Sequence, residues 1–147
     1  MNKILTILLI LIFEMSYSQT EKPLEIDPEI KKLTQELIDN GTIYNLEYLD
    51  KVYDDNLKYI RIDKDNKIRL LTKEDNMVFF KSLKDSGAKP LSKYAEFHYA
   101  DNDGKKGYVI LTRKMKRNGI EQEFLFNIYW ENLSGEWKIV RETVFLK

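Results

Sequence analysis

The side chains best suited to chemistry are a single histidine, a glutamate two residues before it, and an arginine near the C-terminus. They are His98, Glu96 and Arg141. If the turn that follows His98 has an even-length loop, strand alternation places Glu96 opposite Leu111 and His98 opposite Val109. Arg141 then lies on the same largely apolar face, which is how a small-molecule pocket is usually built. An odd-length loop would put the aromatic neighbours of His98 on that face instead.

Two interpretations of these residues remain open. In the functional one, His98 is a general acid or base tuned by Glu96 or Asp54, and Arg141 holds an anionic ligand. In the structural one, Glu96 and Arg141 form an ion pair and His98 is a hydrogen-bonded, half-buried residue, and we favour this interpretation. Asp54-Asp55 is similarly either a carboxylate pair at a pocket mouth or, as we favour, a polar end to a helix.

The sequence contains no motif for a metal site or for covalent catalysis. With no cysteine and one histidine the chain cannot build a structural zinc site. Asp101-Asn102-Asp103-Gly104 has the composition of a calcium loop, but aligning its glycine puts Tyr99 and Ile110 at ligand positions, where neither can coordinate. No nucleophile elbow or glycine-rich phosphate loop is present. We therefore expect no metal and no cofactor.

A meander of four antiparallel strands, from Tyr94 to Phe145, must position the candidates. Three turn pairs divide it: Asp103-Gly104, Asn118-Gly119 and Ser134-Gly135. Closing the chain on these pairs sets charged and aromatic partners opposite one another. The expected pairs are Lys116 with Glu121, Lys114 with Glu123, Tyr108 with Tyr129, Glu131 with Lys138, Trp130 with Ile139, and Phe124 with Phe145.

The elements before the meander are three helices and a strand pair. Asp27-Pro28 predicts a helix start and Asn40-Gly41 its end. A shorter helix is expected from about Asn45 to Tyr53, ended by residues 54–56. Strands at residues 57–62 and 68–71 and a helix from the capping box Thr72/Asp75 to Ser86 follow. The order predicts an α+β domain with helices on one face of a bent, mostly antiparallel sheet.

The first residues are typical of a signal peptide. Lys3 precedes a short apolar run at residues 4–13, and Ser16-Tyr17-Ser18 offers a cleavage site before Gln19. The run is too short for a permanent membrane span, and Glu14 disfavours an uncleaved anchor. We expect a signal peptide at 1–18, a flexible lead-in at 19–26 and one domain at 27–147, in a periplasmic or secreted protein. Cleavage would leave 23 basic and 23 acidic residues, from 24 and 24, and this balance disfavours a nucleic-acid partner.

The pattern resembles the cone-shaped nuclear transport factor 2-like superfamily, which includes SnoaL-like polyketide cyclases, ketosteroid isomerases and scytalone dehydratase. The resemblance covers the mature chain and rests on residues 49–55, the helix from Thr72, and the closing strand at residues 135–140. It implies a pocket between sheet and helices, and often dimerisation through the sheet. The pocket candidates are Tyr53, Glu96, His98, Phe126, Trp130 and Arg141.

Three functions are compatible with these observations. The first is an exported non-catalytic binding module that holds a small apolar or amphipathic molecule, dimerises through its sheet, or both. The second is a cofactor-free dehydratase, isomerase or cyclase that uses His98 with a carboxylate such as Asp54. The third is a protein-binding module of the immunity type. Fold alone does not decide among them.

Overall fold

A six-stranded mixed sheet, in the order β2-β1-β6-β5-β4-β3, forms the body of the protein in a computed structural model. The model describes residues 24–117 and 119–147, so the expected signal peptide lies outside the described residues. The helices are α2 (Pro28–Thr42), α3 (Leu46–Val52) and α4 (Lys73–Asp85), and the strands are β1 (Tyr53–Ile62), β2 (Ile68–Leu71), β3 (Glu96–Asn102), β4 (Lys106–Arg117), β5 (Ile120–Leu133) and β6 (Glu136–Leu146). Every neighbouring pair is antiparallel except β1 with β6, which is parallel.

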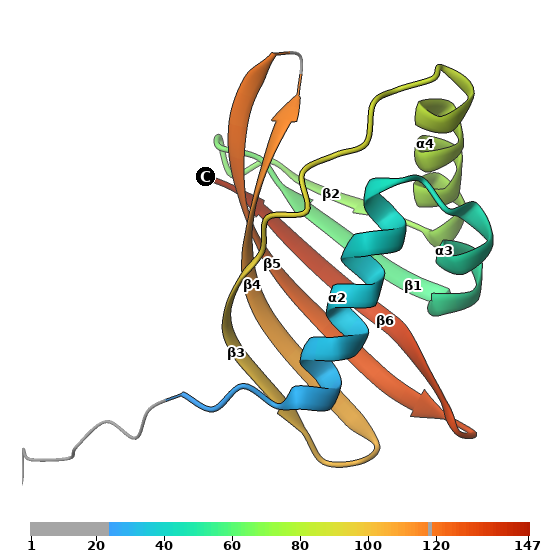
Figure 1. Cartoon of the computed structure of the whole chain (residues 1–147), viewed down its shortest axis with the longest axis vertical. Helices are drawn as coiled ribbons and strands as arrows, with labels where there is room; N and C mark the ends of the chain where they lie inside the picture. Colours follow the sequence, from blue (N-terminus) through green and yellow to red (C-terminus); the bar gives the residue numbers. More distant parts are fainter. Residues whose placement is uncertain (1–23, 118) are drawn as a thin grey trace, which may run out of the picture.

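The helices lie on one side of the curled sheet (Figure 1). Helix α2 packs on β3 and β4, α3 packs on β6 and β1, and α4 packs on β1 and β2. This arrangement confirms the predicted α+β class with helices on one face of a bent, mostly antiparallel sheet. Within the described ranges, no helix is both long and apolar enough to cross a membrane.

The helix starts follow the predicted caps. Asp27 accepts the backbone N–H of Ile30 at 2.9 Å, and Thr72 and Asp75 form the reciprocal capping box that opens α4. Asn40-Gly41 does not end α2, because the helix continues to Thr42 and the left-handed residue is Tyr44, with φ 57°. The predicted end of α3 is confirmed to within one residue, but residues 54–56 are not a loop, because β1 begins at Tyr53 rather than at residue 57.

The last residue of the expected lead-in pairs with the edge strand β3. Ile26 forms a parallel bridge with Ala100 of β3, and Asp27 donates its N–H to the Ala100 carbonyl at 2.9 Å. Residues 19–23 lie outside the described part of the chain.

The core sits between the helices and the inner face of the sheet. Ile30 of α2, Leu49 of α3, Val109 and Leu111 of β4, and Ile139 of β6 have no exposed surface. Gly107 lets α2 approach closely, because a Cβ at this position would lie 2.1 Å from Cδ1 of Ile30. The helix and the sheet are therefore in direct backbone-to-side-chain contact at this point.

The β-bulges in β6 and β3 decide which side chains of the predicted site point inward. The hairpin of β4 and β5 has the predicted register throughout, and Trp130 lies opposite Ile139 as expected. Val140 is then an extra residue in β6, so Phe124 faces Leu146 and the predicted pair of Phe124 with Phe145 is wrong.

The second bulge is at His98 in β3. Phe97 lies opposite Leu111 and Tyr99 lies opposite Ile110, so His98 is the extra residue. Ala100, rather than His98, lies opposite Val109. The prediction that Glu96, His98 and Arg141 share the face of Leu111 is therefore wrong, because each bulge reverses the alternation of its strand.

Candidate functional site

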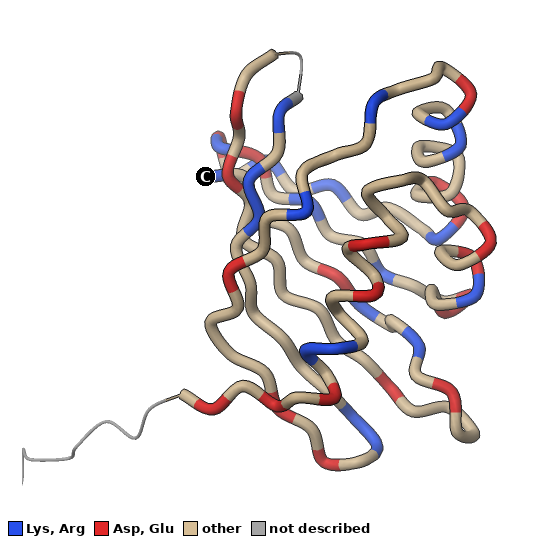
Figure 2. Tube along the Cα trace, in the orientation of Figure 1, with Lys and Arg blue, Asp and Glu red and all other residues tan. Residues whose placement is uncertain are grey.

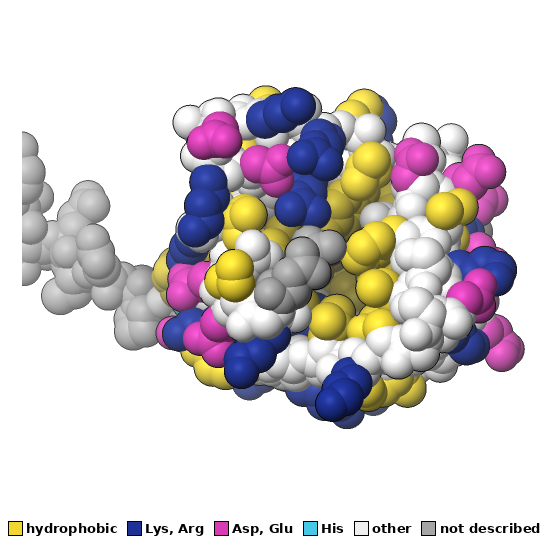
Figure 3. Space-filling view, turned by 90° about the horizontal axis from the view of Figure 1, so that it is seen from above, with side chains coloured by type: hydrophobic (Ala, Val, Ile, Leu, Met, Phe, Trp, Pro, Cys, Tyr) yellow, Lys and Arg dark blue, Asp and Glu magenta, His cyan; other side chains and the backbone are white. Residues whose placement is uncertain are grey.

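A cavity of about 990 Å³ opens between the inner face of the sheet, helices α2 to α4, and the segment that follows α4. Most of its wall is apolar, with Phe79, Phe80, Phe124, Phe126 and Leu83 among the lining residues. Figure 3 shows the hollow from above, lined by hydrophobic side chains, with basic side chains along one side. A pocket of this size and character is suited to a small organic molecule.

Of the six predicted pocket residues, Tyr53 and Phe126 line this cavity. Tyr53 is buried at the start of β1, where α3 passes directly into the strand. Trp130 is also on the inner face but lies in the core with 1% of its surface exposed, outside the cavity wall.

The remaining three predicted pocket residues lie on the outer face, away from the helices, and they make separate contacts. His98 Nε2 lies 2.7 Å from the Thr112 hydroxyl, which faces outward on β4. Glu96 accepts a hydrogen bond from the Tyr94 hydroxyl. The guanidinium of Arg141 lies 5.7 Å from the ring centre of Tyr129.

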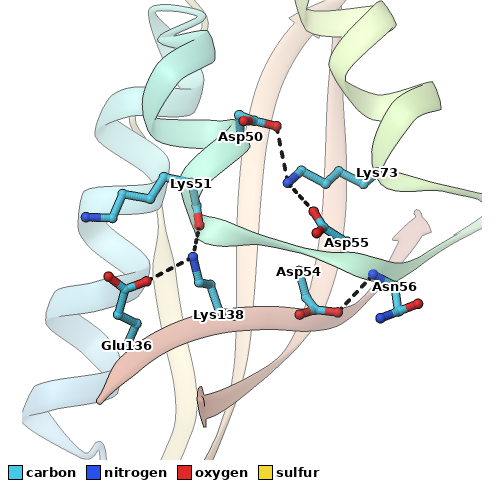
Figure 4. A network of polar contacts seen from close by, with 8 residues as sticks. All are labelled: Asp50, Lys51, Asp54, Asp55, Asn56, Lys73, Glu136 and Lys138. Carbon is cyan, nitrogen blue, oxygen red and sulfur yellow. Dashed lines mark hydrogen bonds and ion pairs between the residues drawn. The ribbon is translucent and has the colours of Figure 1, made fainter. Parts of the chain in front are cut away.

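Asp54 and Asp55 do not form a carboxylate pair at the cavity. Asp54 accepts the backbone N–H of Asn56 at 2.9 Å, and Asp55 is paired with Lys73 at 2.9 Å (Figure 4). Asp54 and Arg141 border a second, shallower depression of about 710 Å³ on the outer face. Neither residue contributes to the larger cavity.

Glu142 is the carboxylate that the sheet contributes to the cavity wall. The bulge at Val140 turns it inward from β6, beside Tyr59 of β1 and opposite Ile128 of β5. Only 4% of its surface is exposed, and its Oε2 accepts a hydrogen bond of 3.4 Å from the Tyr53 hydroxyl. Burial raises the pKa of Glu142 to about 7, although the charge of Arg113 and the Tyr53 hydrogen bond oppose this rise.

Arg113 is the second ionisable group inside. It comes from β4, next to Leu111 and Met115 on the cavity wall. Burial lowers the pKa of its guanidinium, and the charge of Glu142 opposes this effect. Arginine nevertheless stays protonated at neutral pH. Burial also raises the pKa of Tyr53 well above its ordinary value, so its hydroxyl remains a donor.

Sequence reasoning missed Glu142 and Arg113 as site residues. A signal for Glu142 is the adjacent pair Ile139-Val140, because two consecutive apolar residues in an alternating strand mark a possible change of phase. Arg113 belongs to a basic run at the end of a hairpin, which is typical of a solvated tip. Among the described residues, no group of His, Cys, Asp and Glu side chains is arranged to hold a metal ion.

Comparison with known proteins gives a fold and no activity. No protein-family model matches the sequence, and no curated protein does. A nuclear transport factor 2-like protein of unknown function from Silicibacter pomeroyi aligns with TM-score 0.64 at 9% identity, over 80% of this chain and 92% of that chain. A nuclear transport factor 2-like protein from Cytophaga hutchinsonii aligns with TM-score 0.62 at 16% identity, over 83% of this chain and 100% of that chain.

A third solved structure, a nuclear transport factor 2-like protein of unknown function in nutrient uptake from Rhodospirillum rubrum, gives TM-score 0.59. Its identity is 16%, over 80% of this chain and 98% of that chain. At such identities the likeness concerns the fold alone, and it confirms the resemblance drawn from the sequence. The chain has the nuclear transport factor 2-like fold.

Proposed function

We propose that this protein is a non-catalytic binding module that holds a small amphipathic molecule in the cavity between its sheet and its helices. The observation that carries the proposal is the cavity itself, about 990 Å³ with a mainly apolar wall and a few convergent polar groups. Tyr53 and Glu142 supply polar groups on one side, and the phenylalanines of α4 and β5 supply the apolar wall. An amphipathic molecule would match both.

The first test is native mass spectrometry of the protein purified from its own host. A bound small molecule at stoichiometric occupancy would support the proposal. A titration with decanol then tests the cavity directly, with Ala88→Trp narrowing it and Lys105→Trp as a control at an exposed loop. Decanol binding that the Ala88 variant weakens and the control retains is the expected result. A protein that emerges empty and binds no decanol would refute a small-molecule function.

Export is the second part of the proposal. The charged start, short apolar run and small residues before Gln19 support removal of residues 1–18. Mass spectrometry of the mature protein should give a chain that begins at Gln19. A mature chain that retains Met1 would contradict the proposal.

The outer face of the sheet supports a homodimer. It carries aromatic rings in contact, with the ring centres of Tyr108 and Tyr129 4.5 Å apart, and Tyr129 is 40% exposed. The described helices all lie on the other face (Figure 1). Tyr129→Glu should convert a dimer into a folded monomer in size-exclusion chromatography with light scattering, and an unchanged mass would count against this interface.

A cofactor-free enzyme is the second candidate, favoured by one observation. Glu142 is a buried carboxyl with a pKa of about 7, bonded by Tyr53 in the cavity, and a group with this pKa is suited to general acid or base catalysis. His98, the catalytic candidate from the sequence, lies on the opposite face. If Glu142 is a base, the protein should catalyse deuterium uptake from D₂O into camphor, an apolar enolisable ketone, and Glu142→Gln should abolish it. No exchange above the rate without protein would favour the binding module.

A further inference from the structure

The charged side chains that line the cavity are mainly basic. Over the chain as a whole, basic and acidic residues are interspersed (Figure 2). Among the described residues, the cavity wall instead includes five basic residues and two acidic ones: Arg61, Arg69, Lys89, Arg113 and Lys116, with Asp75 and Glu142. A cavity with this balance favours an anionic ligand over a cationic one.

Three of the seven charged residues described on the cavity wall have partners of opposite charge or a helix cap. Arg61 and Arg69 both bond the carboxylate of Asp63, each at 2.9 Å. Asp75 accepts hydrogen bonds from the backbone N–H and the hydroxyl of Thr72, both at 2.8 Å. These groups have partners within the protein and do not call for a ligand.

Arg113 has no close counter-ion in the described part of the chain and, unlike the exposed Lys89 and Lys116, it is partly buried. Its Nη2 donates to the Ser92 carbonyl at 2.8 Å, and its guanidinium lies 5.8 Å from the ring centre of Phe126. Its buried Nε has no acceptor among the described residues, and no described carboxylate lies within 4.0 Å. A guanidinium carries five N–H donors, so most of its donor capacity remains for a ligand.

Glu142 does not neutralise Arg113. The two make no ion pair in the described structure, and burial raises the pKa of Glu142, which favours its neutral form. Asn76 of α4 adds a second unsatisfied donor on the cavity wall, since its buried Nδ2 also has no acceptor among the described residues. Both unsatisfied groups on the wall are N–H donors, which need a ligand that supplies acceptors.

We propose that the cavity binds an amphipathic carboxylate, with the carboxylate held by Arg113 and the apolar chain packed on Phe124, Phe126 and the α4 phenylalanines. This inference rests on the proposed binding function and adds the class of ligand. A carboxylate is favoured over a point charge because its two oxygens match the planar donors of a guanidinium. The apolar wall requires the remainder of the molecule to be hydrocarbon-like.

Isothermal titration calorimetry at pH 7 with three probes of equal chain length tests the inference. Decanoate, decanol and decylammonium differ only in the polar end. We expect decanoate to bind at least tenfold more tightly than decanol, as the loss of a charged hydrogen bond would give, and decylammonium to bind most weakly. Arg113→Gln should bring the decanoate affinity to that of decanol, whereas Arg141→Gln, an arginine exposed on the outer face, should leave the ratio unchanged.

The outcomes separate the two proposals. If decanol and decanoate bind equally to the unmodified protein, the cavity is a binding site but Arg113 is not its anion receptor, and this inference is overturned. If no probe binds, the binding function itself fails. Because the comparison of probes on the unmodified protein needs no variant, it decides the question even where Arg113→Gln does not fold. Circular dichroism of each variant shows whether its fold is intact.

Discussion

The buried Glu142 should make the protein less stable as the pH rises from about 4.5 to about 7. Its pKa is about 7 in the folded chain against 4.5 for an ordinary glutamate. Between these values the folded state keeps a proton that the unfolded state has lost, so the free energy of unfolding falls with increasing pH. Below 4.5 both states are protonated, and above 7 both are ionised, so the change is confined to this window.

The magnitude follows from the same two values. The difference between about 7 and 4.5 is about 2.5 units, and at about 1.4 kcal/mol per unit this corresponds to about 3–4 kcal/mol. Glu142→Gln removes the titration while keeping the shape of the side chain. The variant should therefore gain about 3–4 kcal/mol over the unmodified protein between pH 4 and pH 8, with most of the gain between pH 4.5 and 7.

The polar groups that face Glu142 oppose the rise in its pKa, because the Arg113 charge and the Tyr53 hydrogen bond both favour the ionised carboxylate, and burial outweighs them. The neighbour of Glu142 on β5, Ile128, is apolar. Urea denaturation at several pH values measures the difference, because the midpoint and slope of each unfolding curve give the free energy of unfolding of that protein. Glu136→Gln, at an exposed glutamate of the same strand, is the control. Parallel stability curves for Glu142→Gln and the unmodified protein would refute the reasoning.

Three further substitutions test the packing and the caps. Thr72→Ala removes the hydroxyl that accepts the Asp75 N–H, and should lower the free energy of unfolding by about 1 kcal/mol in urea denaturation. An unchanged free energy would mean that the cap does not stabilise the helix. Gly107→Ala places a Cβ 2.1 Å from Ile30 Cδ1 and should cost about 1–3 kcal/mol, and an unchanged melting temperature would contradict the close contact. Tyr53→Phe removes the hydroxyl that donates to the buried carboxyl of Glu142, so the pKa of that carboxyl should rise further. Carbon NMR of the Glu142 side chain measures this pKa, and a fall would contradict the hydrogen bond.

The predictable part of the fold is the part determined by neighbouring residues. The caps at Asp27 and Thr72 depend on a side chain and a backbone group three residues away, and both are confirmed. The register of β4 with β5 follows from one short turn and the pairs it aligns, and it is confirmed along the whole hairpin. Such features need no knowledge of the rest of the chain.

The predicted site failed where a single extra residue changed the alternation of a strand. Neither His98 nor Val140 is a glycine, and nothing in the local sequence requires a bulge at either position. The start of β1 was predicted four residues too late for a similar reason. Residues 54–56 are polar enough to form a loop, but the burial of Tyr53 and Leu57 on either side holds them in an exposed strand. Long-range packing decided the outcome in each case.

The buried carboxyl on the sheet wall of the cavity is thus a product of the bulge in β6 rather than of composition. Without the extra residue, Arg141 would point inward and Glu142 outward. With it, Arg113 and Glu142 lie on the same wall without a close ion pair, which costs stability that apolar residues would not. Departures from local rules are expected where a protein binds something. A ligand that satisfies Arg113 would offset this cost, which is why the cavity is a more promising place to look for function than the histidine on the outer face.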